Sequence, residues 1–289
     1  MRYRFMRFPG GREKAVTLSY DDGYPTDIKF SEIITKAGLK CTFNLNSEKM
    51  RPVFMTKEQV IEHIIKKGHE IAIHGTNHRA QGTLRPIEGI RDVLDCRLEL
   101  EERYGVIIRG MAYPDTGINH FANDVTYDNI KRYLEDLGVV YARTWGDDNN
   151  SFELPRDWYA WMPSAHHTNP EIMALIDEFI NLNLSKNINP AKRTPKLFYL
   201  WGHSGEFENY KAWELLEKIC EKLGEHNEFW YATNIEIYEY TKAYNSLIYS
   251  ADSTIVYNPT LYDIWFDEDG KIYKISPGQT LKLQQNRRS

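Results

Sequence analysis

The chain has few cysteines and no long apolar run. Its 289 residues include three cysteines, Cys41, Cys96 and Cys220, which lie far apart and form no Cys-x-x-Cys pair. Neither a disulfide framework nor a cysteine-based zinc site is therefore indicated. No stretch approaches the roughly 20 consecutive apolar residues of a membrane span, and the basic N-terminal segment lacks the apolar run of a signal peptide. We therefore expect a cytoplasmic protein with no membrane partner, although a secreted protein trimmed of its signal would look the same.

The chain also lacks an excess of positive charge. It contains 36 Lys and Arg against 41 Asp and Glu, which gives a formal net charge of -5. A mildly acidic chain without a basic run gives no electrostatic reason to expect nucleic acid as a partner. Hydrophobic residues make up 42% of the sequence, enough for one large core or two modest ones. The oligomeric state is left open.

Short β-branched and aromatic runs alternate with longer amphipathic patterns along most of the chain. The predicted strands are Ala15–Tyr20, Lys40–Asn46, Glu70–His74, Ile108–Tyr113, Val139–Thr144, Lys196–Trp201 and Phe229–Thr233. Helical stripes at 172–180 and 213–223 are among the patterns that separate them. Strands that alternate with helices predict parallel βα units. About seven such units favour an α/β fold with one TIM-like barrel, but periodicity alone leaves a doubly wound sheet possible.

The pattern changes near the C-terminus. From about Ile248 onward, apolar and polar residues alternate, and the stretch around Glu268, Asp269 and Gly270 is typical of a hairpin turn. About 40 residues make a poor independent core. We therefore predict a barrel domain over residues 1–245 and a small β-hairpin extension over residues 246–289 that packs on the barrel.

Two motifs combine carboxylates and imidazoles at predicted strand ends. Asp21 and Asp22 leave the first barrel strand, and His74 and His78 follow the third. Adjacent carboxylates could divide their work between a cation and a proton, although Asp and Gly are also common in caps and turns. Two imidazoles four residues apart can converge on one metal, and a carboxylate can supply a third ligand. Capped or solvated histidines are the structural alternative.

Two further motifs lie at later strands. Arg109 on the fourth strand requires an anionic partner, which an ordinary buried ion pair would also provide. His203 follows the sixth strand between glycines, which suits an acid/base role or a surface turn. All four motifs fall at or beyond the C-terminal ends of strands, the face where active sites of βα barrels assemble. Together they predict one site.

The order of these motifs closely resembles the NodB-homology polysaccharide deacetylases, carbohydrate esterase family 4. Asp-Asp-Gly after strand one, His-x-x-x-His after strand three, Arg and a Tyr-Pro turn on strand four and a late His carry the resemblance, over roughly residues 12 to 240. The resemblance implies a distorted (β/α)7 barrel. It also implies that Asp22, His74 and His78 bind a divalent metal ion, with zinc as the expected ion and open positions for water and substrate.

The resemblance also implies roles for the groups around the metal. Asp21 would be the general base, oriented by Arg109, and the turn at Tyr113, Pro114 and Asp115 would offer a backbone N–H to the oxyanion. A carboxylate at Asp115 departs from the family, which has an aromatic residue there.

His203 would be the general acid, held by an Asp from the loop after strand five. Asp157 in LPRDWYAWMP matches that Asp best, and Asp147 and Asp148 compete with it. The Leu-Trp-Gly-His element that carries His203 is one residue longer than the Leu-x-His of the family.

Aromatic side chains near these motifs are candidates for a sugar-binding groove. Trp145, Trp158, Trp161 and Trp201 could line it, although core packing is the more common role of such residues. His166 and His167 lie close by in sequence, and a structural or substrate-contact role is favoured over metal ligation.

The expected function is metal-dependent hydrolysis of N- or O-linked acetyl groups on a carbohydrate, by metal-activated water with an Asp base and a His acid. The expected partner is thus an acetylated carbohydrate. The alternatives are the same machinery acting on a small non-sugar amide and a catalytically silent carbohydrate-binding protein.

Overall fold

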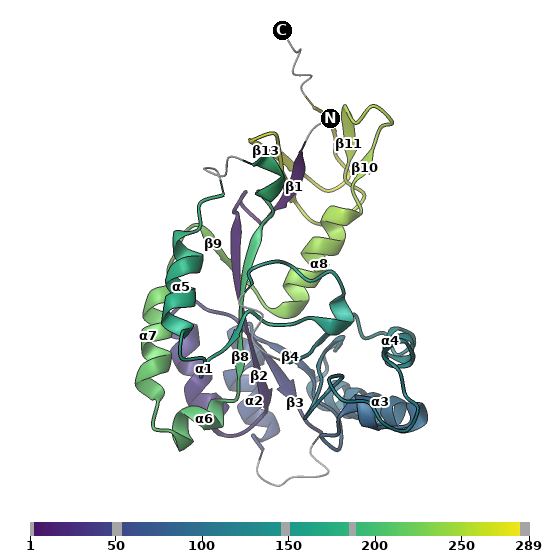
Figure 1. Ribbon diagram of the computed structural model, residues 1–289, viewed down its shortest axis with the longest axis vertical. Coiled ribbons are helices and arrows are strands. Elements are labelled where there is room, and N and C mark those ends of the chain that lie inside the picture. Colours follow the sequence, from purple (N-terminus) through teal and green to yellow (C-terminus); the bar gives the residue numbers. More distant parts are fainter. Residues whose placement is uncertain (1–2, 48–53, 146–150, 185–188, 284–289) are drawn as a thin grey trace.

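A computed structural model describes residues 3–47, 54–145, 151–184 and 189–283 (Figure 1). Seven parallel strands form its centre in the order β6-β5-β4-β3-β2-β8-β7. They are β2 (Lys14–Asp22), β3 (Cys41–Leu45), β4 (Glu70–Ile73), β5 (Gly110–Ala112), β6 (Tyr141–Arg143), β7 (Ala165–His166) and β8 (Lys196–Gly202). Arg143 at the end of β6 also pairs in parallel with Trp161, just before β7. This pairing joins the two outer strands, so the sheet curls into the predicted distorted (β/α)7 barrel.

Helices surround the barrel, as βα units require. They are α1 (Thr26–Lys36), α2 (Lys57–His63), α3 (Pro86–Tyr104), α4 (Tyr127–Asp136), α5 (Ile172–Asn181), α6 (Ser204–Asn209), α7 (Trp213–Leu223) and α8 (Asn234–Asn245). Short 3₁₀ turns lie at η2 (Ile65–Lys67), η3 (Gln81–Thr83), η4 (Trp158–Ala160) and η5 (Pro190–Lys192). The predicted helical stripes are confirmed: α5 buries Ile172, Ile176 and Phe179, and α7 buries Leu216, Ile219, Cys220 and Leu223. None of the described helices is both long and apolar enough to cross a membrane.

The strands differ from the prediction at two places. Phe229–Thr233 forms a short strand, β9 (Phe229–Tyr231), which pairs with the first half of β2 and lies off the main order. The ring is completed instead by β7, which the sequence did not reveal. A two-residue strand in the polar segment around His166 has neither an apolar run nor an alternating pattern.

The C-terminal strands, together with the N-terminal strand β1, form two small antiparallel sheets at the top of Figure 1. One contains β1 (Arg4–Arg7), β12 (Ile264–Glu268) and β13 (Lys271–Ile275), and the other contains β10 (Ile248–Tyr249), β11 (Ile255–Tyr257) and β14 (Thr280–Lys282). The hairpin predicted around 268–270 is present between β12 and β13. The Tyr240 hydroxyl of α8 donates to the Arg7 carbonyl and accepts the Trp265 amide, which ties these strands to α8. The division at residues 245 and 246 stays a prediction.

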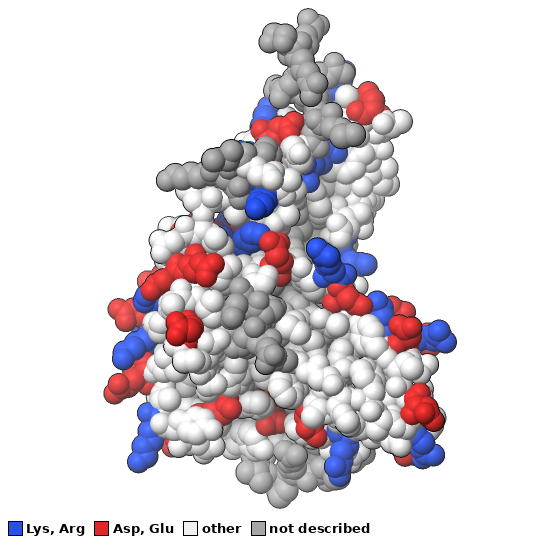
Figure 2. All heavy atoms as spheres, in the orientation of Figure 1, with Lys and Arg blue, Asp and Glu red and all other residues white. Residues whose placement is uncertain are grey.

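Acidic and basic side chains are interspersed on the face of the molecule seen in Figure 2. His69 is one of several titratable side chains that are buried in the fold. His69 precedes β4 and is 7% exposed, with its Nδ1 accepting the Cys41 amide at 3.3 Å and its Nε2 2.9 Å from the Thr35 hydroxyl. Burial, with the nearby Lys40, lowers the pKa of His69 to about 4. The imidazole is therefore neutral in the folded chain at neutral pH.

We predict that His69 makes the protein sensitive to mild acid. Between pH 6.5 and 4 the unfolded chain binds a proton that folded His69 does not, so stability falls as pH falls through that window. From pH 7 to pH 5 this contribution amounts to about 2 kcal/mol. Urea denaturation at both pH values should show that His69→Gln loses about that much less stability on acidification than the parent. Equal losses in both proteins would contradict the assignment.

Candidate metal and catalytic site

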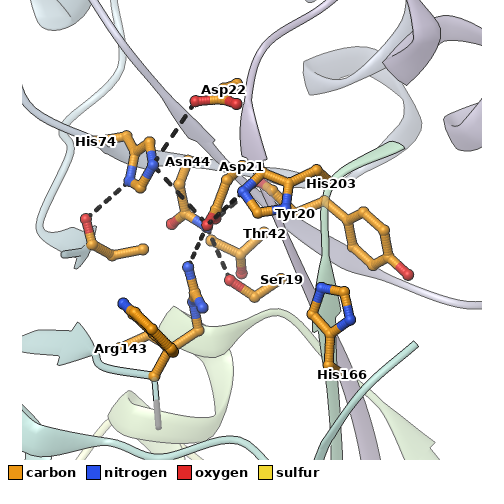
Figure 3. Close-up of polar contacts among 12 residues, drawn as sticks. Ser19, Tyr20, Asp21, Asp22, Thr42, Asn44, His74, Arg143, His166 and His203 are labelled. Carbon is orange, nitrogen blue, oxygen red and sulfur yellow. Dashed lines mark hydrogen bonds and ion pairs between the residues drawn. The ribbon is translucent and has the colours of Figure 1, made fainter. Parts of the chain in front are cut away.

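Several of the predicted site residues meet at the C-terminal end of the barrel (Figure 3), where a cavity of about 660 Å³ opens. Asp21 and Asp22 end β2, His74 follows β4 and His203 follows β8. The lining includes Asp21, His74, His78, Trp201, His203 and Glu206. Motifs that are far apart in the sequence therefore lie together in one cluster at this cavity.

Asp22, His74 and His78 form a candidate metal centre. One ligand atom from each lies within 4.8 Å of the others. The Asp22 carboxylate is 3.5 Å from His78 Nε2 and 3.8 Å from His74 Nε2. His74 Nδ1 lies 3.0 Å from the Ala112 carbonyl, which fixes Nδ1 as the protonated nitrogen and leaves the Nε2 lone pair for a cation. The donor set and this tautomer fit a divalent ion such as zinc.

The loop that carries both histidines is tied to helix α3. The Asp92 carboxylate accepts the Asn77 amide at 2.8 Å, and the Thr76 hydroxyl donates to the Asp92 carbonyl at 3.0 Å. Gly75 has a φ of 76°, and a Cβ there would lie 2.5 Å from an Asp92 oxygen. Because only glycine allows this approach, Gly75 lets the chain bring His74 and His78 to the same side.

Asp21 occupies the buried centre of the site. It is 3% exposed, and its carboxylate accepts Asn44 Nδ2 at 2.8 Å and the guanidinium of Arg143. Burial opposes its ionisation, but the charge of Arg143, together with nearby imidazoles, brings the pKa of Asp21 below its ordinary value. Asp21 Oδ2 also lies 3.8 Å from His74 Nε2 and 3.9 Å from His203 Nε2. An ionised carboxylate thus lies between the metal triad and an imidazole.

The prediction that Arg109 orients Asp21 is wrong. Arg109 precedes β5, at the entrance of the strand, and its guanidinium pairs with Glu239 of α8. Arg143 holds Asp21 instead, because it ends β6 at the same barrel edge as Asp21, and its side chain is 1% exposed. The sequence did contain a signal for Arg143, which ends the apolar run VVYAR. An Arg within an apolar strand is also the pattern that led to the prediction of Arg109.

His203 is held by Glu206 and not by the predicted Asp157. Asp157 instead accepts the Tyr127 hydroxyl and the Lys131 ammonium, both at 2.9 Å, and its side chain caps η4. His203 Nδ1 lies 3.5 Å from Glu206 Oε2. Burial opposes protonation of His203, but Glu206 and Asp21 outweigh it and raise its pKa to about 9. The competing candidates, residues 147 and 148, lie outside the described residues.

Glu206 could have been found from its spacing. His203 and Glu206 form a capping box at the start of α6, in which the Glu206 carboxylate accepts the His203 amide at 3.2 Å. A Glu three residues after the N-cap, the residue just before a helix, is a known signal of such a box.

The predicted oxyanion turn borders the cavity. Tyr113 and Asp115 line it, while the Tyr113 hydroxyl donates outward to the Tyr159 carbonyl at 2.9 Å. Pro114 packs close to Gly75. Asp115 has a φ of 52°, a left-handed conformation that Asp tolerates better than most residues. The structure thus places this turn beside the histidine loop.

Only some of the predicted aromatic residues reach the cavity. Trp145 and Trp201 line it, and the Arg143 guanidinium lies 4.4 Å from the centre of the Trp201 ring. The prediction of Trp161 as a groove residue is wrong, whereas Trp158 is partly exposed, packs against Trp161 and Tyr238 and is not among the residues that line the cavity. Trp161 is 1% exposed and packs edge-on against Trp158 and Tyr199, because its backbone pairs with β6 and its side chain is part of the apolar core there.

Residues 9–140 match the model of the polysaccharide deacetylase family. This part carries Asp21, Asp22, His74, His78 and the turn at Asp115. The match confirms the resemblance predicted from the motifs: residues 9–140 are similar to the polysaccharide deacetylases. No curated protein matches the chain.

Several solved structures are similar to the chain at low identity. A peptidoglycan deacetylase, PdaC, from Bacillus subtilis shares 14% identity, with 81% of this chain and 94% of that chain covered and a TM-score of 0.48. A family 4 acetyl xylan esterase from Clostridium thermocellum, in complex with a cobalt ion, shares 14% (78% and 90% covered, TM-score 0.45). A family 4 pseudoenzyme from Bacillus anthracis shares 15% (81% and 68% covered, TM-score 0.45). No function follows from similarities this distant.

We predict that zinc binds at Asp22, His74 and His78. Calorimetric titration of metal-free protein with zinc should show that Asp22→Ala and His78→Ala each lower the zinc affinity more than roughly 100-fold. Removing a residue that only orients a ligand typically lowers the metal affinity by roughly 10- to 100-fold. Asp21→Asn should lose less than either. Asp157→Asn is the matched control, because its carboxylate lies away from the cavity, and its affinity should equal that of the parent. Parent-like affinity in Asp22→Ala would refute the site.

Proposed function

We propose that the chain is a metal-dependent hydrolase that removes acetyl groups, on nitrogen or oxygen, from a carbohydrate. The observation that carries the proposal is the position of Asp21. Its carboxylate lies between the candidate metal triad and His203, at 3.8 Å from His74 Nε2 and 3.9 Å from His203 Nε2. Hydrolysis of an acetyl group needs a base, an acid and a charged centre around one carbonyl, and these groups supply all three.

The metal ligands would be Asp22, His74 and His78. A divalent ion held there would polarise the acetyl carbonyl and lower the pKa of a bound water from 15.7 to about 7. The similarity of residues 9–140 to the polysaccharide deacetylase family supports this assignment. Zinc is the proposed ion because two imidazoles and a carboxylate are a common catalytic zinc set.

Asp21 is the proposed general base. Arg143 and Asn44 hold its carboxylate, and its lowered pKa keeps it ionised at neutral pH. It removes the proton from water as the water oxygen attacks the acetyl carbon, a contribution typically worth roughly 10²–10⁴-fold in rate. A backbone N–H of the turn at Asp115 would stabilise the oxyanion that forms.

His203 is the proposed general acid. Its Nε2 faces Asp21 in the cavity, while Nδ1 faces Glu206. With its pKa raised to about 9, the imidazole carries a proton at neutral pH and can give it to the leaving group. The bond between the acetyl carbon and the sugar nitrogen or oxygen then breaks, which releases acetate and an amine or alcohol.

The carbohydrate part of the proposal rests on the family and on the lining of the cavity. Trp145 and Trp201 present aromatic surface beside the catalytic groups, and Asn169 adds a polar group. Flat aromatic side chains suit the apolar faces of sugar rings.

We predict that chelation abolishes acetate release from acetylated oligosaccharides and that added zinc restores it. Asp21→Asn should lose roughly 10²-fold or more in kcat while still binding zinc, because it removes the base and leaves the ligands. Both can be followed with an enzymatic acetate assay. Full activity of the chelated protein would exclude the proposal. Release of acetate from small non-sugar amides alone would favour that narrower substrate class.

We also predict that Arg143, and not Arg109, supports the base. Arg143→Gln should lower kcat because Asp21 loses its buried charged partner, which raises the pKa of Asp21 and releases its carboxylate. The free energy of unfolding should fall as well, because leaving a buried charge without its partner destabilises a protein by about 3–5 kcal/mol. Arg109→Gln is the matched control and should keep parent kcat, because its guanidinium pairs with Glu239. The opposite ranking in steady-state kinetics would restore the original role of Arg109.

A further inference from the structure

A second cluster of imidazoles surrounds one carboxylate oxygen beside the catalytic groups. Glu206 Oε2 lies 3.3 Å from His166 Nε2, 3.3 Å from His167 Nε2 and 3.5 Å from His203 Nδ1. It also accepts the His203 amide at 3.2 Å. Figure 3 shows His166 and His203 on the same side of the site. Four nitrogens therefore face one oxygen.

The residue types of this cluster are those of a metal site. His166, His167 and Glu206 each offer a ligand atom, and the three atoms lie within 4.8 Å of one another. A metal bound through His166 Nε2 would need a lone pair on that nitrogen. The protonation state of His166 therefore decides between a metal site and a hydrogen-bonded cluster.

Thr168 fixes the protonation of His166. Its backbone N–H donates to His166 Nδ1 at 3.2 Å, and its hydroxyl lies 2.6 Å from the same nitrogen. Because Nδ1 accepts, the proton of the neutral ring is on Nε2, which faces Glu206. His166 is thus arranged to donate a hydrogen bond to the carboxylate.

His167 is arranged in the same way. Its Nδ1 lies 3.3 Å from the Tyr20 hydroxyl, whose proton it can accept, and its Nε2 faces Glu206. The ring is 1% exposed and stacks on Phe207 at 4.1 Å. A Cβ on Gly202 would lie 2.0 Å from His167 Nδ1, so the glycine before His203 makes the space for this ring. The extra residue in Leu-Trp-Gly-His therefore accommodates His167.

We propose that Glu206, anchored by His166 and His167, is the positioning residue of the general acid His203. Two neutral imidazoles donate to the carboxylate and hold it, still charged, beside Nδ1 of His203. The charged oxygen then accepts the His203 Nδ1–H, which turns Nε2 toward Asp21 and the leaving group. This inference rests on the proposed function, because it assigns His203 a proton to deliver.

The dependence on the leaving group tests the proposal. Glu206→Met removes the acceptor at similar side-chain length, so His203 should lose its orientation. With an N-acetylated oligosaccharide, kcat should fall roughly 10²-fold with KM within about twofold, because only the acid is affected. With 4-nitrophenyl acetate, whose leaving group needs no proton, kcat should stay within about threefold of the parent. Glu206→Gln keeps an amide oxygen that can still accept one N–H, so its kcat on the oligosaccharide should lie between those of the parent and Glu206→Met.

Glu208→Met is the matched control, because Glu208 lies on the same helix but accepts the Trp213 indole N–H instead. It should retain parent rates on both substrates. Equal losses on both substrates in Glu206→Met would mean that Glu206 only maintains the fold, and would overturn the proposal. Parent-like rates with the oligosaccharide would overturn it as well.

Two readouts need no turnover, so they separate this inference from the proposed function. Zinc titration of the parent should show one bound equivalent, and His166→Phe should bind the same amount. A second equivalent in the parent that is lost in His166→Phe would instead identify a metal site at His166, His167 and Glu206. Nitrogen NMR of labelled histidines, with His203→Gln to assign the signal, should show protonated Nδ1 on His203 in the parent and its loss in Glu206→Met. If the parent releases no acetate at all, the proposed function fails, and the NMR result still decides the role of Glu206.

Discussion

The ion pair between Arg143 and Asp21 is the interaction on which the site depends. Both side chains are almost fully buried, and an ionised carboxylate there is stable only with a charged partner and hydrogen bonds. Arg143 provides the charge, and Asn44 provides a hydrogen bond. The pair keeps a base ionised within 4 Å of two imidazoles. Without it, burial would favour the protonated acid, which cannot accept a proton.

The barrel places this pair by its closure. Arg143 ends β6, and its backbone pairs with Trp161, which leads into β7 and so to β8. The buried Trp161 side chain fills the space behind that junction. A residue that the sequence indicated as a sugar contact therefore acts as part of the wall. The same closure brings His166 and His167 of the β7 segment against Glu206, which follows β8.

Much of the fold followed from the sequence because parallel strands leave clear apolar runs. Strand β2 is buried along its whole length, and its run Ala15–Tyr20 was visible for that reason. Strand β7 was missed because backbone pairing across two residues leaves no pattern in the side chains. The metal triad was predictable because Asp22 ends a long apolar strand and the two histidines, four residues apart, follow another buried strand. Arg143 and Glu206 each carried a local signal, an Arg that closes an apolar strand and a Glu at capping-box spacing. They were missed because such signals do not say which side chain the residue meets, and Asp21 and His166 are distant in sequence from Arg143 and Glu206.

The two carboxylate clusters make different use of the same residue types. At Asp22, the Ala112 carbonyl accepts a hydrogen bond from Nδ1–H of His74, which leaves Nε2 unprotonated as a ligand. At Glu206, the Thr168 amide does the reverse to His166 and makes Nε2 a donor. The hydrogen bond that Nδ1 makes thus decides whether Nε2 can bind a metal ion, as in His74, or donates to a carboxylate, as in His166.

The most direct test is anomalous diffraction at the zinc edge from crystals soaked in zinc. The account predicts a peak bonded to Asp22, His74 and His78 at about 2.0–2.2 Å, with Asp21 held by Arg143 beside it. A peak bonded to His166, His167 and Glu206, with none at Asp22, would contradict it.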